Sequence, residues 1–444
     1  MNQLIRVLGR RPQPRKYSPV MSLSNDPQVR LSRPMHVWIV QTGESLPCDG
    51  AAERPMRATA LTRALELSGH RVTVISSDFW HQKKKHRVGR FARICTGPLT
   101  EIVLLPSMGY SRHVGAKRLL DHRQLGAQFR KYAPLLERPD VMLVGFPPIE
   151  IAFEAVSLAS RWGIPSILDV KDHWPDIFWQ RLPGVLKQAA RFAMRGMEHQ
   201  AKLTFQHANS LTSMSLPFLE WAADRAGRPL KPLDRAFPFG CDSPITCAAT
   251  PNADERSIVF AGSITRSFDF LTLIDGFRRS RFAASGGKLV ICGTGDSEDS
   301  LKGFTKGDNR ILFRGWQSSP ELAVSLNSAL LGAAPYVDRD DFKMSLPNKI
   351  VEYTSFGLPI LAPSTGEIAQ FVRRLGVGYL YEPGSPAQCA AGIDTAAART
   401  PEQVEADCGS VRRYFRENLE SGSVYCSFVR HLEEVATVRV SKHG

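Results

Sequence analysis

The stretch that decides the fold runs His36-Val-Trp-Ile-Val40, a loop with Thr42-Gly43, a segment from Arg57 to Ser68, Gly69, and Val72-Thr-Val-Ile75. The first and last runs are short and apolar, as in buried strands, and the middle segment repeats apolar residues at helical spacing. Gly69 supplies a helix stop. A strand, a helix and a second strand in this order form a βαβ crossover, which predicts a parallel sheet.

The same alternation of strands and helices recurs along the chain. Further strands are predicted at Asp140–Val144, Ile164–Val170, Ser210–Ser213, Ile258–Ala261, Lys288–Cys292, Arg310–Phe313, Ala329–Ala334 and Pro359–Ala362. Helices are predicted near Val114–Leu136, Ile149–Trp162, Val185–His207, Phe268–Arg279, Asn348–Phe356 and Glu402–Lys442. The pattern predicts two doubly wound α/β domains facing across a cleft, with ligands beyond the carboxyl ends of the strands.

The domain boundaries follow from shifts in composition. Residues 1–34 hold seven basic residues, one acidic residue and five prolines, which predicts a flexible basic tail. Residues 35–242 are predicted to form the first domain and residues 243–405 the second. Residues 406–444 are predicted to be helices that pack back toward the first domain.

Composition limits the partners and the compartment. The chain has 444 residues, 57 basic against 43 acidic side chains and a net charge of +14, which favours an anionic partner. None of the eight cysteines forms a C-x-x-C pair, so scattered thiols in a reducing cytoplasm are expected. The start lacks the apolar segment of a secretory signal, and no apolar run is long enough to predict a spanning helix.

Two stretches of the second half carry the features of a phosphate site. Gly262-Ser263 follows a strand, and the stretch through Arg266 is predicted to open a helix whose backbone N–H groups attract phosphate. Lys349 lies at the start of another predicted helix, with Glu352 one turn later. The alternatives are an exposed arginine on an ordinary loop, and a solvated i,i+3 pair of Lys349 with Glu352. Gly293-Thr-Gly295 repeats the strand-to-glycine pattern but is a weak signal alone.

Several motifs together resemble one enzyme family. The run Leu346-Pro-Asn-Lys-Ile-Val-Glu-Tyr353, followed by Gly357-Leu-Pro359, resembles the PSK-x-x-E-Y-x-x-x-G-x-P signature of glycosyltransferase family 4, in its bacterial cell-surface polysaccharide branch. Phe146-Pro-Pro-Ile-Glu150 and Asp169-Val-Lys-Asp-His-Trp-Pro-Asp176 resemble the PP and D-x-R-D-x-W-P segments of that branch. Phe313-Arg-Gly-Trp316 falls in the family's order, and the resemblance covers nearly the whole folded chain.

The resemblance implies a GT-B fold, in which the first domain lies on the acceptor side and the second binds the nucleotide sugar. It also implies a retaining transfer of a sugar from a nucleotide diphosphate sugar. It implies donor diphosphate contacts from Arg266, Lys349, Gly262 and Ser263, and nucleotide contacts from Glu352, Arg314, Trp316 and Gly293. Glu352 matches the family's ribose-binding glutamate. Met344 stands where the family's other glutamate would be, so the contact to the donor sugar is left open.

In the first half the resemblance places Lys171, Asp172 and His173 as catalytic residues beside the transferred sugar. Lys171 replaces the family's arginine, so a point charge takes the place of a fork. Asp172 could stabilise positive charge at the anomeric carbon, or it could cap a short helix before Pro175.

Acceptor contacts are expected from Arg57 and from His81, which lies in a basic stretch with aromatic residues. The D-x-D in Asp338-Arg-Asp-Asp341 resembles a metal motif, but neither a metal nor another cofactor is expected. The basic helices near residues 114–136 and 185–207 suit an anionic membrane surface, or they are ordinary surface helices with their apolar faces in the core.

The resulting hypothesis is a hexosyl- or N-acetylhexosaminyl-type glycosyltransferase. It would use a UDP- or GDP-sugar and a lipid-linked or polysaccharide acceptor, as in lipopolysaccharide synthesis, in the cytoplasm or peripherally on the inner membrane face. The alternatives are a nucleotide-sugar epimerase with the same two domains and a basic nucleic-acid-binding protein. The second is disfavoured because no base-reading module is present.

Overall fold

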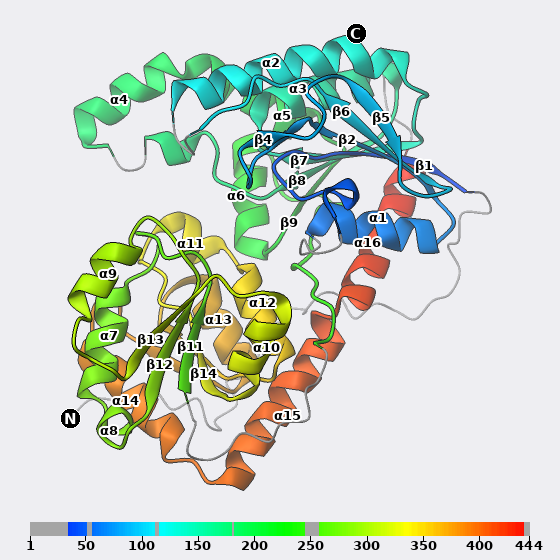
Figure 1. Ribbon diagram of the computed structural model, residues 1–444. Helices are drawn as coiled ribbons and strands as arrows, with labels where there is room; N and C mark the ends of the chain where they lie inside the picture. The colour runs from blue at the N-terminus through cyan, green and yellow to red at the C-terminus, as the bar shows by residue number, and fades with distance from the viewer. Residues whose placement is uncertain (1–33, 51–55, 112–114, 180–181, 245–256, 439–444) are drawn as a thin grey trace. The chain divides into compact units, whose positions relative to one another are not determined.

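The computed structural model describes residues 34–50, 56–111, 115–179, 182–244 and 257–438. Residues 1–33 of the predicted tail lie outside the described residues, as does most of the polar stretch after the predicted domain boundary. The chain forms two compact units (Figure 1). The C-terminal unit is Phe239–Ser423, and the N-terminal unit comprises the described residues up to Pro238 together with those from Val424 onward.

An eight-stranded sheet forms the centre of the N-terminal unit, in the order β10-β9-β8-β7-β1-β2-β6-β5. All neighbouring pairs are parallel except β5 with β6. The strand order reverses at β1, which has β2 on one side and β7 on the other. The strands are β1 (His36–Val40), β2 (Arg71–Ser77), β5 (Ala92–Cys95), β6 (Thr100–Leu105), β7 (Val141–Phe146), β8 (Ser166–Val170), β9 (Ser210–Ser213) and β10 (Arg235–Ala236), while β3 (Phe79–Trp80) and β4 (Lys85–His86) form a separate pair.

Helices cover both faces of this sheet, which explains why β1, β7 and β8 are buried along their whole length. Figure 1 shows α2, α3 and α5 over one face and α1 and α16 over the other. The elements are α1 (Arg57–Leu67), α2 (Ala116–Tyr132), α3 (Ile149–Trp162), α4 (Gly184–Ala193), α5 (Arg195–His207), α6 (Leu216–Ala226) and α16 (Ser421–Ala436), with the short 3-10 helices η1 (Pro47–Asp49), η2 (Ala133–Leu135) and η3 (Asp176–Phe178).

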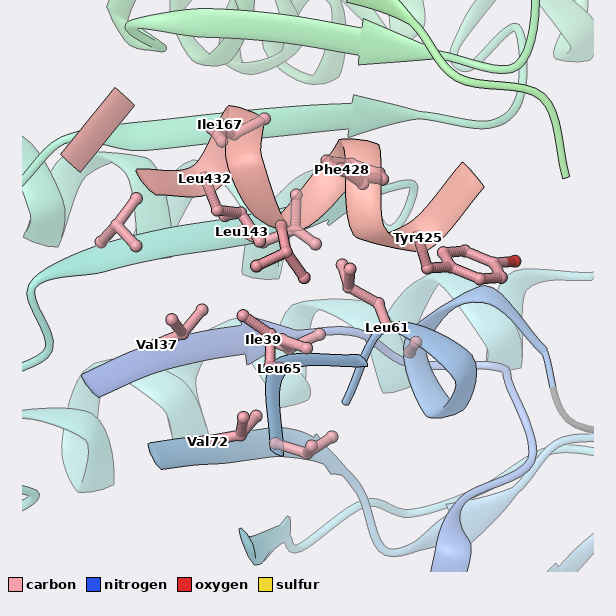
Figure 2. Close-up of a cluster of buried hydrophobic side chains, with 14 of the residues drawn as sticks. Val37, Ile39, Leu61, Leu65, Val72, Leu143, Ile167, Tyr425, Phe428 and Leu432 are labelled. Carbon is pink, nitrogen blue, oxygen red and sulfur yellow. The ribbon is translucent and has the colours of Figure 1, made fainter. Parts of the chain in front are cut away.

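The last helix of the chain completes the core of the N-terminal unit (Figure 2). Phe428 and Leu432 of α16 pack with Leu61 of α1, Ile39 of β1 and Leu143 of β7, all less than 5% exposed. The helix before it, α15 (Pro401–Asn418), belongs instead to the C-terminal unit. The sequence analysis grouped residues 406–444 as one set of terminal helices, whereas the structure divides them after Ser423.

The C-terminal unit contains a six-stranded sheet in the order β13-β12-β11-β14-β15-β16, with every pair parallel. This is the doubly wound order, and it reverses between β11 and β14. The strands are β11 (Ser257–Ala261), β12 (Lys288–Cys292), β13 (Ile311–Gly315), β14 (Ala329–Ala333), β15 (Ile360–Pro363) and β16 (Tyr379–Tyr381).

Two apolar clusters, one on each side of this sheet, hold the C-terminal unit together. One contains side chains of α7 and α14, and the other contains side chains of α12, α13 and α15. The helices are α7 (Phe270–Arg279), α8 (Arg281–Ala284), α9 (Glu298–Phe304), α10 (Ser319–Asn327), α11 (Asp340–Met344), α12 (Asn348–Ser355), α13 (Gly366–Leu375) and α14 (Pro386–Ala397), besides α15. None of the helices within the described residues has the length and apolarity needed to cross a bilayer.

Candidate functional site

The glycine loops of the C-terminal unit lie where its strand order reverses. Gly262 follows β11 and Gly293 follows β12, and the two loops touch: the N–H of Gly262 donates to the carbonyl of Cys292 at 2.9 Å. A Cβ on Gly293 would lie 1.9 Å from the carbonyl oxygen of Gly262, so no larger residue fits there. Gly262 and Gly293 also have φ angles of 138° and 143°, which glycine tolerates best. The loops are therefore held by close backbone contact.

Helix α12 is anchored at this same edge by Tyr353. The hydroxyl of Tyr353 accepts a hydrogen bond from the N–H of Ala261 at 2.8 Å and donates to the carbonyl of Ala333 at 3.1 Å. Ala261 ends β11 and Ala333 ends β14, so one buried side chain links α12 to both strands at the reversal point. This contact gives a structural reason for the tyrosine in the motif that contains Lys349.

The ammonium group of Lys349 lies in a cage of aromatic rings. Its Nζ is 3.5 Å from the ring centre of Phe260, 3.9 Å from that of Phe268 and 5.6 Å from that of Tyr336. The side chain is more than nine-tenths buried, and its Nζ has no hydrogen-bond partner among the residues that the structure describes. A Cβ on Gly262 would lie 3.1 Å from the Nζ, so the ammonium sits directly behind the exposed Gly262 backbone.

Burial dominates the electrostatics of Lys349. Removal from water lowers the pKa of Lys349 well below its ordinary value, and the charge of Glu352 opposes that shift only in part. Because the Nζ has no hydrogen-bond partner, the alternative of a hydrogen-bonded Lys349–Glu352 pair is not what the structure contains. A buried cation without a hydrogen-bonding anion carries an energetic cost, which an anionic ligand in contact with it would reverse.

The helix N-termini near the glycine loops are not equivalent. The helix predicted after the Gly262 loop, from about Phe268, is α7, which begins at Phe270. The stretch from Gly262 to Arg266 therefore lies before the helix, and the carboxylate of Asp269 accepts from Thr272 N–H at 3.0 Å and caps it. Helix α12 begins after Pro347 with no side-chain cap and no acidic residue in its first turn. In the first turn the N–H of Ile350 donates to the carbonyl of Pro347 at 3.0 Å, and no side chain of the described residues competes with an anion at the N-cap. Arg266 and Ser263 are exposed on the loop.

Trp316 and Arg314 lie at the end of β13, beside the glycine loops. The N–H of Gly293 donates to the carbonyl of Gly315 at 2.6 Å, which brings these loops together. Arg314 is exposed, and Trp316 is 73% exposed, an unusual degree for an indole. The exposed indole of Trp316 beside the glycine loops is a flat apolar surface on which a ring could stack.

The N-terminal unit holds a buried network of charges at the carboxyl ends of its strands. Lys171 follows β8, and its Nζ donates to Glu44 at 2.5 Å and to Gln41 at 2.8 Å, and lies 3.4 Å from Asp169. The Lys171 ammonium is therefore held by protein groups, which differs from the expected open point charge beside the sugar. Glu44 also accepts from the N–H of Ala58 at the start of α1.

Arg57 belongs to this network and not to an exposed acceptor surface. Its side chain is 2% exposed, donates to the carbonyl of Phe237 at 2.6 Å and lies 3.4 Å from Asp169. Burial alone would raise the pKa of Asp169, but the charges of Arg57 and Lys171 hold it below its ordinary value. The guanidinium of Arg57 is thus a buried partner of Asp169, and the acceptor contact expected from it stays a prediction.

Asp172 and His173 differ in what they can reach. The carboxylate of Asp172 is half-buried and accepts from the N–H of His173 at 2.8 Å. It does not cap the following 3-10 helix, whose N-cap is Pro175, so that alternative is excluded. His173 is fully buried, with its ring 4.4 Å from Trp221 and 4.5 Å from Phe218 between centres. The structure therefore gives His173 a packing position and leaves Asp172 as the more accessible acid.

His81 lies in a cluster of cations around Tyr110. The His81 Nδ1 is 2.6 Å from the Tyr110 hydroxyl, the Lys84 Nζ is 4.8 Å from the Tyr110 ring, and the Arg118 guanidinium is 5.7 Å from that ring. Burial and the nearby Arg118 lower the pKa of Lys84. Burial, Arg118 and His81 together lower the pKa of His122 to about 3. His122 is thus a buried neutral ring, and the cations that this cluster can offer to an anion are Lys84 and Arg118.

The D-x-D stretch offers no metal site in the structure. Asp341 is bound by the guanidinium of Arg339, and Asp338 accepts from Thr365 and lies 3.1 Å from the Lys343 Nζ. Within the described residues, no group of histidine, cysteine, aspartate or glutamate side chains could hold a metal ion.

Sequence reasoning missed the residues that surround the predicted ones. Phe260, Phe268 and Tyr336 come from three separate segments, and nothing in their local sequence marks them as a cage. Gln41 and Glu44, which hold Lys171, lie in the loop after β1. Their position after the first strand, at the reversal of the sheet order, is the signal that could have found them.

Comparison with known proteins agrees with this geometry. Residues 255–399 match the family profile described as "Glycosyl transferases group 1". The chain has no match among curated protein sequences. Sucrose-phosphate synthase from Thermosynechococcus elongatus is similar in structure, with a TM-score of 0.68 and 15% identity over 91% of this chain and 99% of that one.

Two further solved structures are similar over most of their length. HepE from Anabaena, in complex with UDP, gives a TM-score of 0.61 and 14% identity over 90% of this chain and 99% of that one. WaaG, described as a glycosyltransferase involved in lipopolysaccharide biosynthesis, gives a TM-score of 0.61 and 12% identity over 91% and 100%. At such identities the likeness shows the fold.

The fold and the matched region define the class of protein. The chain has the GT-B fold, with two Rossmann-like units in one polypeptide. It is a glycosyltransferase, and residues 255–399 are its glycosyl transferases group 1 domain. The GT-B fold that the resemblance implied is thus confirmed, and the family profile matches the second half of the chain.

Proposed function

We propose that the protein transfers a sugar from a nucleotide diphosphate sugar, first of all a UDP-sugar, to a lipid-linked or polysaccharide acceptor with retention of configuration. The buried ammonium of Lys349 carries this proposal, because it has no hydrogen-bond partner and lies behind the exposed Gly262 backbone. A diphosphate on that backbone would supply the missing anion. A structural neighbour that binds UDP, HepE, supports the choice of nucleotide.

The other donor contacts are proposed around Lys349. The uncapped start of α12 and the exposed Arg266 and Ser263 would contact the diphosphate together with Gly262. Glu352, one turn along α12, would accept hydrogen bonds from the ribose. Trp316, with Arg314 and Gly293, would border the base. All these groups belong to the C-terminal unit.

The proposed reaction needs no protein nucleophile. The bond between the anomeric carbon and the diphosphate oxygen breaks, and the acceptor hydroxyl oxygen bonds to the same carbon from the same face. The acceptor proton passes to an oxygen of the leaving phosphate. Cations and helix N–H groups stabilise the charge that develops on the diphosphate. Asp172 would stabilise positive charge at the anomeric carbon, and His173 would hold the backbone of Asp172 through its packing against Trp221.

The acceptor is proposed to carry an anionic group. His81, Lys84 and Arg118 around Tyr110 form the cationic surface that would receive it, and a phosphate of a lipid carrier or of a glycan core has the required charge. A role in lipopolysaccharide-type synthesis at the inner face of the cytoplasmic membrane fits this chemistry. WaaG, a structural neighbour, is described as a glycosyltransferase involved in lipopolysaccharide biosynthesis.

Binding and turnover test the proposal separately. The melting temperature of the full chain is measured with UDP, GDP, pyrophosphate and AMP, since a ligand that binds only the folded state raises it. We expect UDP to stabilise, and the Glu352→Gln variant to weaken UDP binding while pyrophosphate binding stays unchanged. Failure of every nucleotide diphosphate to bind would overturn the donor assignment.

Retention and the acceptor are tested by the product. Turnover of UDP-glucose and UDP-N-acetylglucosamine with a lipid diphosphate acceptor is followed by NMR of the new anomeric proton. An inverted product would contradict the proposed stereochemistry. Conversion of the donor to its epimer without any acceptor would instead favour the epimerase alternative.

A further inference from the structure

Helix α4 differs from the helices that pack on the sheet, because none of its residues is buried. Val185 is 83% exposed, Leu186 57% and Phe192 68%. A surface helix normally turns such side chains into the core. Figure 1 shows α4 extending from one end of the N-terminal unit.

The apolar side chains of α4 share one face. At helical spacing Val185, Leu186, Ala189 and Phe192 lie on one side, whereas Lys187 and Arg191 lie on the other. The helix is therefore amphipathic, with its apolar side in solvent. The next helix, α5, has the ordinary arrangement, since it buries Met197, Ala201 and Phe205. The single basic helix predicted over Val185–His207 is thus two helices with opposite relations to the core.

The charge around α4 has one sign. The stretch from Val185 to Arg195 contains three cations and no acidic residue. Arg191 is tied back to Glu198 of α5 at 2.9 Å, and the guanidinium of Arg195 lies 4.7 Å from the Phe192 ring centre. Aromatic and aliphatic side chains with cations beside them match the interface of an anionic bilayer, where apolar groups enter and cations stay at the headgroups.

We propose that the exposed face of α4 binds the surface of an anionic membrane, with Leu186 and Phe192 entering the interface and Lys187, Arg191 and Arg195 at headgroup level. A second copy of the chain fits less well, because two α4 helices, each with Lys187, Arg191 and Arg195 and no acidic residue of its own, would bring like charges together. The inference deepens the proposed lipid-linked acceptor by giving the protein a membrane-facing surface.

The location of α4 in the chain agrees with that use. The helix begins at Gly184, shortly after the segment that holds Asp172 and Trp174. The Arg191 guanidinium lies 5.8 Å from the Trp179 ring centre, and the Arg118 guanidinium of the Tyr110 cluster lies 5.1 Å from the Trp174 ring centre. Two tryptophans of one segment, Trp179 and Trp174, thus contact a cation of α4 and a cation of the Tyr110 cluster, which is proposed to receive an anionic acceptor.

Vesicle binding of the full chain tests the inference. Flotation is measured with vesicles of phosphatidylcholine alone and of phosphatidylcholine mixed with phosphatidylglycerol, at low and high salt. We expect the unchanged chain to bind the mixed vesicles, and this binding to weaken as salt increases. The double variant L186S/F192S should bind them more weakly by a factor on the order of ten or more. The variant K187Q/R191Q should lose a few-fold per charge and much of the salt dependence.

Leu67→Ser is the matched control, because Leu67 is 90% exposed on α1 of the same unit. It should bind vesicles like the unchanged chain. The α4 variants should keep their melting temperature and UDP binding, so that loss of vesicle binding is separate from failure of the donor site. Any of three outcomes would overturn the inference. The unchanged chain does not bind the vesicles, or L186S/F192S binds them equally well, or the unchanged chain is a dimer and L186S/F192S is a monomer.

Discussion

Replacement of Lys349 by methionine tests whether the ammonium of Lys349 serves to bind a ligand or to stabilise the fold. Methionine keeps the length of the side chain and its contact with the rings of Phe260 and Phe268. It removes an ammonium that has no hydrogen-bond partner and has lost its water. Cation–π contact with the two rings, about 2 kcal/mol, offsets only part of a desolvation cost of several kcal/mol. We therefore expect the unliganded variant to be as stable as the parent, or more stable by about 1–4 kcal/mol.

The same change should weaken the donor. A hydrogen bond to a charged group contributes about 1.5–3 kcal/mol, which corresponds to roughly a ten- to hundredfold loss of affinity for UDP. Titration calorimetry measures the affinity, and urea unfolding without ligand measures the stability. Lys288→Met is the control, because Lys288 begins β12 at the opposite edge of the sheet. A Lys349→Met variant that is markedly less stable and binds UDP as tightly as the parent would refute the reasoning.

The pH dependence of stability provides a second readout of Lys349. Because folding lowers the pKa of Lys349, the unfolded chain holds this proton more tightly than the folded one. The contribution of Lys349 to stability therefore rises as pH increases from the lowered pKa toward the ordinary one. This rise should be absent in Lys349→Met. Bound diphosphate should reverse the shift, so UDP binding should take up a proton and weaken as pH increases.

Four further outcomes are expected. Trp316→Ala should weaken UDP by about 1–3 kcal/mol without changing pyrophosphate binding or unliganded stability, because the indole is 73% exposed; calorimetry distinguishes the two ligands. Asp269→Ala should cost about 1 kcal/mol of stability, because α7 loses its N-terminal cap, and should leave the affinity for UDP unchanged. A lower affinity for UDP would instead indicate that the N-terminus of α7 contacts the ligand. Gly293→Ala should lower the melting temperature and UDP binding because of its 1.9 Å contact, whereas Gly303→Ala, with open space around it, should do neither. Asp169→Asn should lower the free energy of unfolding by about 3–5 kcal/mol near neutral pH. The lowered pKa of Asp169 stabilises the fold only at pH values above that pKa, so the variant should also lack the part of the acid-induced loss of stability that comes from Asp169. Urea unfolding at several pH values measures both effects.

Local patterns in the sequence predicted the regular elements well. Strands β1 and β12 and helix α3 lie at their predicted bounds, because their apolar runs are buried on both faces or end at a glycine. Strand β16 and helix α6 were not predicted. The strand has only three residues, and the helix begins with Pro217 in its first turn, so each gives a weak periodic signal.

The site was predictable residue by residue only in part. The motif placed Lys349 at the start of a helix, as found, but its aromatic cage comes from tertiary packing of distant segments. Charge in the sequence made Arg57 and Lys171 look like ligand contacts. Whether a cation faces a ligand or a buried acid depends on Asp169 and Glu44, which only the folded sheet brings beside them.

The packing of α16 in the N-terminal unit determines when that unit can complete its folding during synthesis. Val424, Tyr425, Phe428, Val429, Leu432 and Val435 belong to the core of the unit synthesised first. At about 1.5–3 kcal/mol for each fully buried large side chain, their absence would remove stability comparable to that of a whole domain. The residues of the N-terminal unit up to Pro238 therefore remain incompletely folded until α16 emerges from the ribosome. Loss of α16 would therefore unfold the N-terminal unit, and a chaperone that binds nascent chains would protect that unit in particular.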